Sequence, residues 1–94
     1  MKSKMYKGTS YEVIAPDTSH GLAIGYVETA QAAVLRTLEA EKRAEEKGYS
    51  RNRWLVVETS WTRVYDSKGE FLRESEHTEV VAVVKEDGTV EYKA

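Results

Sequence analysis

The fold is decided by residues 53–85, which read RWLVVETSWTRVYDSKGEFLRESEHTEVVAVVK. Two runs rich in β-branched and aromatic residues, 53–65 and 70–85, flank the turn formers at 66–69. Such runs are typical of strands, and a glycine at the fourth position suits a type I turn with a bulge. The stretch therefore predicts one long antiparallel hairpin.

The register of this hairpin follows from its turn and its apolar pattern. With one bulge residue in the turn, the predicted pairs are Asp66–Glu70, Tyr65–Phe71, Val64–Leu72, Val56–Val80, Leu55–Val81 and Trp54–Ala82, with Trp61 beside Ser75. A shift by one residue mixes apolar and polar side chains on both faces, which favours this register. It also places Arg63 opposite Arg73, a repulsion that neighbouring glutamates offset.

Upstream of the hairpin, the sequence predicts two strands and a helix. Residues 9–15 predict a strand, 16–21 a hairpin loop, and 22–27 a second short strand. The alternative extends the helix back over residues 22–27, with Ser19 as its cap. Residues 30–47 predict a helix that Thr29 caps and Gly48 ends.

One face of this helix is suited to packing on a sheet. A stripe of small and apolar residues at spacings of three and four runs from Ala30 to Glu41, while the charged residues between 39 and 47, Glu41 included, form a solvated face. A second turn at 86–89 leads to an edge strand at 90–92. The predicted fold class is α+β: an antiparallel β-sheet in β-β-α-β-β-β order, with one helix packed on one face and a long 53–85 hairpin.

Length and composition limit the number of domains and the classes of partner and chemistry. The 94 residues suit one α+β domain at 9–94 after a flexible basic N-terminus at 1–8. A net charge of −2 offers little attraction to nucleic acid or to acidic membranes, and the lack of cysteine excludes thiolate chemistry. No apolar run resembles a signal peptide or a membrane span, so a cytoplasmic protein is expected.

The hairpin carries more apolar surface than one helix can cover. Residues 54–57 and 80–84 are apolar on both faces, whereas a half-exposed antiparallel strand should alternate. A second copy of the chain is the economical cover for the remaining face. The hairpin also spans about 43 Å against about 28 Å for the helix, so it can project as an arm carrying aromatic residues. The alternative is a strongly twisted hairpin that curls over the helix and hides them.

Two groups of residues are of the types used in enzyme or metal sites, and a structural role is favoured for both. Asp17, Ser19 and His20 are near neighbours on one loop, whereas a catalytic triad is assembled from separate elements. His77 lies among three glutamates, but only alternate residues of a strand share a face, and zinc gathers three or four ligands. No catalytic residue, metal site or cofactor is predicted.

One family shares part of this layout. A strand, a helix and then RWLVVE at 53–58, opening a long hairpin, resemble the dodecins, small oligomeric flavin-binding proteins, over residues 29–84. The resemblance implies a flavin stacked on Trp54. The alternative role for Trp54 is a core residue under the helix. The extra N-terminal strand, long helix and extended hairpin differ from that family.

These patterns predict a small non-enzymatic interaction module, an adaptor or inhibitor of a protein partner, that self-associates as a homodimer. The acidic segment 70–79 suits a basic protein partner. The predicted interface residues are Leu55, Val57, Trp61, Tyr65, Phe71, Val81 and Val83. The alternative is a small-molecule (flavin- or nucleotide-like) binding protein with an inter-subunit aromatic pocket, in which Trp54 and Trp61 stack on the ligand.

Overall fold

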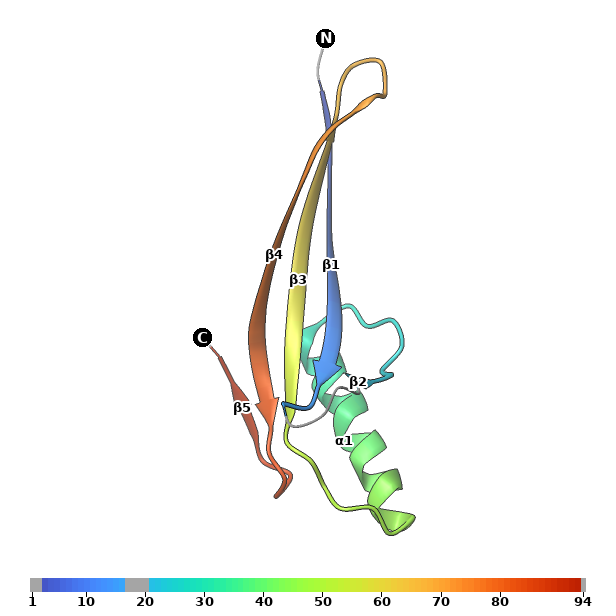
Figure 1. Ribbon diagram of the computed structural model, residues 1–94, viewed down its shortest axis with the longest axis vertical. Coiled ribbons are helices and arrows are strands. Elements are labelled where there is room, and N and C mark those ends of the chain that lie inside the picture. The colour runs from blue at the N-terminus through green and yellow to red at the C-terminus, as the bar shows by residue number, and fades with distance from the viewer. Residues whose placement is uncertain (1–2, 17–20, 94) are drawn as a thin grey trace.

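The computed structural model describes residues 3–16 and 21–93. Its elements are β1 (Lys4–Ile14), β2 (Gly21–Leu22), α1 (Ala30–Glu46), β3 (Trp54–Tyr65), β4 (Phe71–Val84) and β5 (Val90–Tyr92). The strands form one antiparallel sheet in the order β2-β1-β3-β4-β5 (Figure 1). The α+β class predicted from the sequence is confirmed. The element order differs slightly from the predicted one, because β2 spans only two residues and the longer elements follow the order β-α-β-β-β.

Helix α1 begins and ends where its capping residues predict. The Thr29 hydroxyl accepts a hydrogen bond from the backbone N–H of Ala32 at 3.1 Å, which satisfies one of the free donors of the first turn. After Lys47, Gly48 adopts a φ of +90°, a conformation that costs glycine little and ends the helix.

The hydrophobic core lies between α1 and one face of the lower half of the sheet (Figure 1). Its buried residues are Val13, Ala15, Ile24, Val27, Ala33, Val34, Trp54, Val56, Ala82 and Val84. Helix α1 contributes Ala33 and Val34 to this cluster. We call this part of the molecule, with α1, β2, β5 and the sheet around them, the base.

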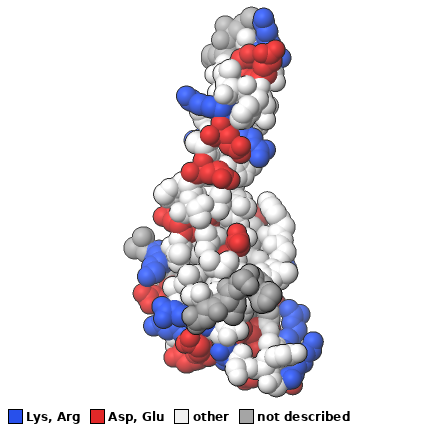
Figure 2. Space-filling model, viewed as in Figure 1, with Lys and Arg blue, Asp and Glu red and all other residues white. Residues whose placement is uncertain are grey.

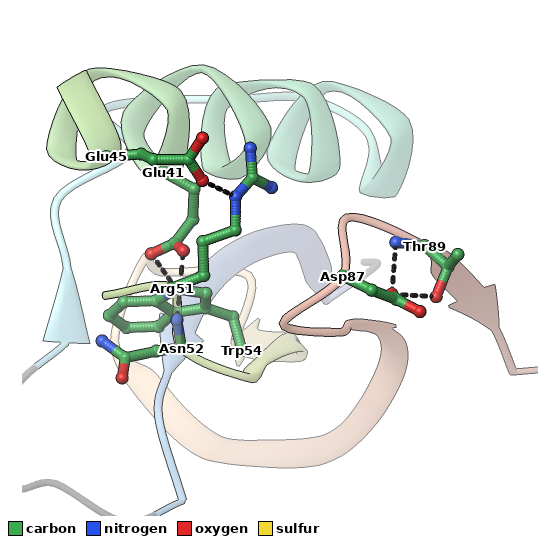
Figure 3. Close-up of polar contacts among 7 residues, drawn as sticks. All are labelled: Glu41, Glu45, Arg51, Asn52, Trp54, Asp87 and Thr89. Carbon is green, nitrogen blue, oxygen red and sulfur yellow. Dashed lines mark hydrogen bonds and ion pairs between the residues drawn. The ribbon is translucent and has the colours of Figure 1, made fainter. Parts of the chain in front are cut away.

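The prediction that the Glu41 side chain is solvated is wrong. It is 5% exposed, on the stripe of α1 that faces the sheet. Its carboxylate accepts hydrogen bonds from the indole Nε1 of Trp54 at 2.7 Å and from the backbone N–H of Asn52 at 3.1 Å (Figure 3). A buried tryptophan needs an acceptor for its N–H, and Glu41 supplies it.

The hairpin register is correct at the turn and wrong along the rest of the ladder. Asp66 N–H donates to Glu70 O, and Tyr65 faces Phe71, as predicted. Two irregularities follow, where Leu72 and then Val81 are left as extra residues on β4. Each is a β-bulge that moves the pairing by one position, because two residues of the bulged strand oppose one of its partner.

The bulges also change which residues face one another. The observed pairs include Val64–Arg73, Arg63–Glu74, Trp61–Glu76, Val57–Val80, Val56–Ala82, Leu55–Val83 and Trp54–Val84. Arg63 therefore faces Glu74 instead of Arg73, and the predicted repulsion is replaced by an ion pair of 3.1 Å.

The N-terminal elements differ in length from the prediction. Strand β1 begins at Lys4 and pairs with β3 along its whole length, from Lys4–Tyr65 to Ile14–Leu55. Residues 4–8 are thus strand and not part of a flexible N-terminus. Strand β2 spans only two residues, and 23–29 is neither the predicted strand nor the start of the helix, because burial of Ile24 and Val27 under α1 holds it as a loop. The expected loop at 16–21 falls largely outside the described residues.

The molecule is elongated, with principal extents of 59 × 26 × 21 Å. β1, β3 and β4 continue far beyond the end of α1, and the alternative of a hairpin curled over the helix is wrong (Figure 1). No helix within residues 3–16 and 21–93 is long and apolar enough to cross a membrane.

Candidate functional site

The part of the sheet beyond α1 forms a three-stranded arm. It comprises residues 4–10 of β1, 59–65 of β3, 71–78 of β4 and the turn between β3 and β4. Side chains alternate between the two faces of a strand. Since Val56 and Trp54 of β3 face α1, the odd-numbered residues of β3 point to the opposite side, which we call the open face.

An aromatic row crosses the open face near the tip of the arm. Tyr65 lies at its centre, with the ring of Tyr6 at 5.6 Å and that of Phe71 at 5.8 Å, both in edge-to-face contact. Phe71 is 56% exposed and Tyr6 50% exposed. Aromatic pairs of this geometry hold three strands together at the tip while leaving large apolar surfaces in contact with water.

Trp61 completes the aromatic row by lying over a glycine. A Cβ atom at Gly8, which Trp61 faces across β1 and β3, would overlap the indole ring. The ring can therefore lie against the backbone of β1 only because residue 8 has no side chain. The guanidinium of Arg63 lies 4.6 Å from the centre of the same ring, in a cation–π contact.

These residues enclose an open groove of about 520 Å³. It is lined by Lys4, Tyr6, Trp61, Arg63, Tyr65 and Gly69. The lining joins two cationic side chains to three aromatic rings, and it includes no carboxylate from residues 3–16 or 21–93. Its volume falls in the range of small-molecule sites, about 300–1,000 Å³.

Carboxylates lie beside the groove on β4. Glu74 pairs with Arg63 at 3.1 Å, and Glu76 faces Trp61 one step further along the open face. Both glutamates are exposed, as is every side chain from Phe71 to Glu79. Acidic and basic groups therefore alternate along the arm, as Figure 2 shows.

The junction between arm and base is marked by a tyrosine–glutamate pair on the α1 side of the sheet. Tyr11 donates its hydroxyl hydrogen to the carboxylate of Glu58 at 2.9 Å, across β1 and β3. Burial, and then the hydrogen bond and charge of Glu58, raise the pKa of Tyr11. This contact ties the two strands next to the arm, where Tyr11 packs against the core.

The predicted interface residues divide into two groups. Trp61, Tyr65 and Phe71 come together on the open face of the arm, as described above. Of the remaining four, Leu55 is half-buried, Val57 and Val83 are buried within the single chain, and Val81 packs against the core cluster. The bulge at Val81 turns this side chain toward the core, so the base of the sheet offers a partner little apolar surface.

Trp54 is 6% exposed and lies in the core under α1, with its N–H bound to Glu41. A residue in this position cannot stack on an external ligand, so the role implied by the resemblance to the dodecins does not apply to Trp54. No family model, curated protein or solved structure matches the chain.

The remaining candidate residues do not form a site. Asp17, Ser19 and His20 lie outside the described residues. His77 is exposed, and its Nε2 lies 3.7 Å from the carboxylate of Glu79. Within residues 3–16 and 21–93, no group of three or more histidine, aspartate and glutamate side chains is placed to hold a metal ion.

Two of the six residues that line the groove, Lys4 and Tyr6, come from β1. Reasoning from the sequence missed them, and Gly8 beside them, because it assigned residues 1–8 to a flexible segment. One signal was available. A predicted strand at 9–15 can pair with only half of a strand at 53–65, and the rest of that strand needs a neighbour of its own. Residues 4–8 directly precede the predicted strand and can extend it.

Proposed function

We propose that the protein is a cytoplasmic, non-enzymatic interaction module that self-associates as a homodimer through the open face of its arm. The observation that carries the proposal is the aromatic row on a ribbon that no second layer covers within the described part of the chain. Exposed aromatic side chains gathered on one surface are typical of interaction sites, and tyrosine, tryptophan and arginine are the residues that most often dominate binding energy there.

The size of this surface indicates how tightly it binds. From standard strand spacings, the open face of the arm measures about 26 Å along the strands and about 14 Å across them. A stable interface buries about 800 Å² on each partner, which is more than this face offers. We therefore expect a weak dimer that forms as the protein concentration rises.

The charges on the open face favour an antiparallel packing of two arms. Lys4 lies opposite Tyr65 at the tip, whereas Glu76 lies opposite Trp61, further from the tip. When two arms pack face to face about a two-fold axis, the tip of each approaches the middle of the other. Lys4 of one copy then lies near Glu76 of the second copy, and both copies make the same contact.

Concentration-dependent light scattering tests the proposal. The mass of the wild type should rise from 10.7 kDa toward twice that value, and Tyr65→Ser should remain monomeric at the same concentrations. Tyr26→Ser is a matched control, because Tyr26 is 81% exposed but lies in the loop before α1, away from the arm. A wild type that stays monomeric, or a dimer that Tyr65→Ser leaves intact, contradicts the proposal.

The groove supports a second candidate function, the binding of a small planar anion such as a flavin or a nucleotide. Its rings offer stacking surfaces, and Lys4 and Arg63 offer charge for a phosphate group. Because Trp54 is buried, quenching of tryptophan fluorescence by flavin mononucleotide would report on Trp61. The candidate is rejected when no quenching occurs, or when quenching persists in Trp61→Phe.

A further inference from the structure

The outer edge of β4 in the arm has no neighbouring strand. β5 pairs only with Ala82–Val84, and the N–H of Lys93 reaches no further than the carbonyl of Val81. Along residues 71–80, β4 is therefore bonded to β3 on one side, and within the described part of the chain no strand lies on the other. In an antiparallel strand every second residue points its N–H and C=O outward, so this edge is a template for another strand.

Natural proteins protect such edges with charged side chains, and β4 carries many. Glu74 is neutralised by Arg63, whereas Glu76 and Glu79 have no arginine or lysine within ion-pairing distance among the described residues. They lie on opposite faces of the strand, since Glu76 pairs with Trp61 and Glu79 with Glu58. A strand laid along this edge meets a carboxylate on each of its faces.

This distribution of charge selects the occupant of the edge. Opposite charges directly across two strands stabilise the pair, and like charges destabilise it. A second copy of β4 would bring the same row of glutamates against itself and is disfavoured. The outer edge of β1, in contrast, carries Lys4 and Lys7 and lacks this acidic character.

We propose that residues 71–80 of β4 bind an extended basic segment of another protein by strand addition. The segment needs lysine or arginine at two positions three residues apart, so that one meets Glu76 and the other Glu79 in an antiparallel pairing. The two residues of the bound segment between these basic positions should be β-formers, because they pair as a strand beside His77 and Thr78. The inference rests on the proposed interaction function but uses the backbone edge of β4, and it shares only Glu76 with the open face.

A peptide binding assay tests this inference. The probe is a fluorescein-labelled peptide of nine residues, threonine and valine with lysines at the third and sixth positions, measured by fluorescence anisotropy at low ionic strength. A peptide with glutamates at the same two positions is its matched control. We expect the lysine peptide to bind at least about tenfold more tightly, and its affinity to fall as salt is added.

Charge reversal on the protein identifies the edge. Glu76→Lys/Glu79→Lys should lose the lysine peptide and bind the glutamate peptide, whereas Lys7→Glu on β1 should leave the affinity for the lysine peptide unchanged or higher. Backbone amide shifts on peptide binding should map to residues 71–80. Shifts on β1, equal binding of both peptides, or no binding would each overturn the inference.

The two proposals can fail separately. Tyr65→Ser removes a side chain of the open face and leaves the β4 edge intact, so it should abolish the dimer and still bind the lysine peptide. A dimer that forms normally while no peptide binds rejects strand addition alone. Peptide binding by a chain that remains monomeric rejects self-association alone.

Discussion

Glu41 and Trp54 join the helix to the sheet through one buried hydrogen bond, in which the indole N–H donates to the carboxylate at 2.7 Å. Glu41 lies in the fourth turn of α1, and Trp54 is the first residue of β3. The second carboxylate oxygen accepts the backbone N–H of Asn52, so that both oxygens have partners (Figure 3). The pair fixes the position of the helix along the sheet, which a stripe of alanines alone would not define.

Removing this carboxylate should destabilise the base. Glu41→Leu leaves the N–H groups of Trp54 and Asn52 without acceptors, and we expect a loss of about 2–3 kcal/mol in the free energy of unfolding. Glu41→Gln keeps one acceptor and should cost less. Urea denaturation measures both, with the exposed Glu39→Gln as a control. In a double-mutant cycle, Glu41→Leu should cost much less when Trp54 is already phenylalanine; equal costs in both backgrounds would contradict the assignment.

Gly8→Ala should displace Trp61 from the arm. In most strands this substitution is neutral or stabilising, because alanine loses less backbone entropy on folding. Here the new methyl group overlaps the indole ring, and we expect a loss of about 1–3 kcal/mol, as for other overpacked sites. The emission of Trp61 should shift to longer wavelength as the ring becomes exposed. Ser10→Ala, two residues further along the same face, should change neither property.

The register produced by the Leu72 bulge can be tested with charge. Glu74→Arg places two arginines opposite one another and should cost about 0.5–1 kcal/mol at low salt, a small effect because both side chains are largely exposed. Ser75→Arg, on the other face of β4 opposite Thr62, should cost less. Without the bulge, residue 73 would face Arg63, and Glu74→Arg would then have no greater effect than Ser75→Arg.

The last turn contains a carboxylate with a lowered pKa. Asp87 Oδ1 accepts hydrogen bonds from the Thr89 hydroxyl at 2.6 Å and from its backbone N–H at 2.9 Å (Figure 3). Both bonds favour the charged form, the hydroxyl more strongly, and they lower the pKa of Asp87. The contribution to stability is therefore present above the ordinary aspartate pKa and is lost as the pH falls through the lowered one.

Thr89→Val removes the hydroxyl and keeps the backbone donor. We expect the pKa of Asp87 to rise toward its ordinary value without reaching it, as measured by the pH dependence of its side-chain carbon shifts. The stability of the variant should then depend less on pH in the acid range. An unchanged titration of Asp87 would show that the hydroxyl does not hold the carboxylate.

Local sequence signals were sufficient to predict the elements that capping residues or turn glycines delimit. Thr29 and Gly48 bound the helix, and Gly69 and Gly88 adopt φ values of +85° and +87° in the two turns that were predicted around them. The difference in length between the hairpin and the helix also predicted the projecting arm. These features depend on residues close together in the chain, where propensity and capping dominate.

The errors arose where distant residues decide the outcome. A bulge at Leu72 or Val81 adds no local signal to a run of β-formers, and it is favoured because it pairs Arg63 with Glu74 and turns Val81 to the core. Likewise, the sequence of residues 4–8 is polar and has no strand pattern of its own. These residues form a strand because their backbone groups pair with residues 61–65 of β3. Gly8, a poor strand residue, is retained there because it accommodates the ring of Trp61.

The ribbon beyond the helix has a consequence for how its length can change. Because its strands are held by neighbours within one sheet and not by a second layer, removing two residues from each of the three strands shortens it by about 6–7 Å without exchanging its inner and outer sides. The base would keep every contact of its core. The length of the arm can therefore change through insertions or deletions of two residues in each of its three strands, and the stability of the base does not depend on it.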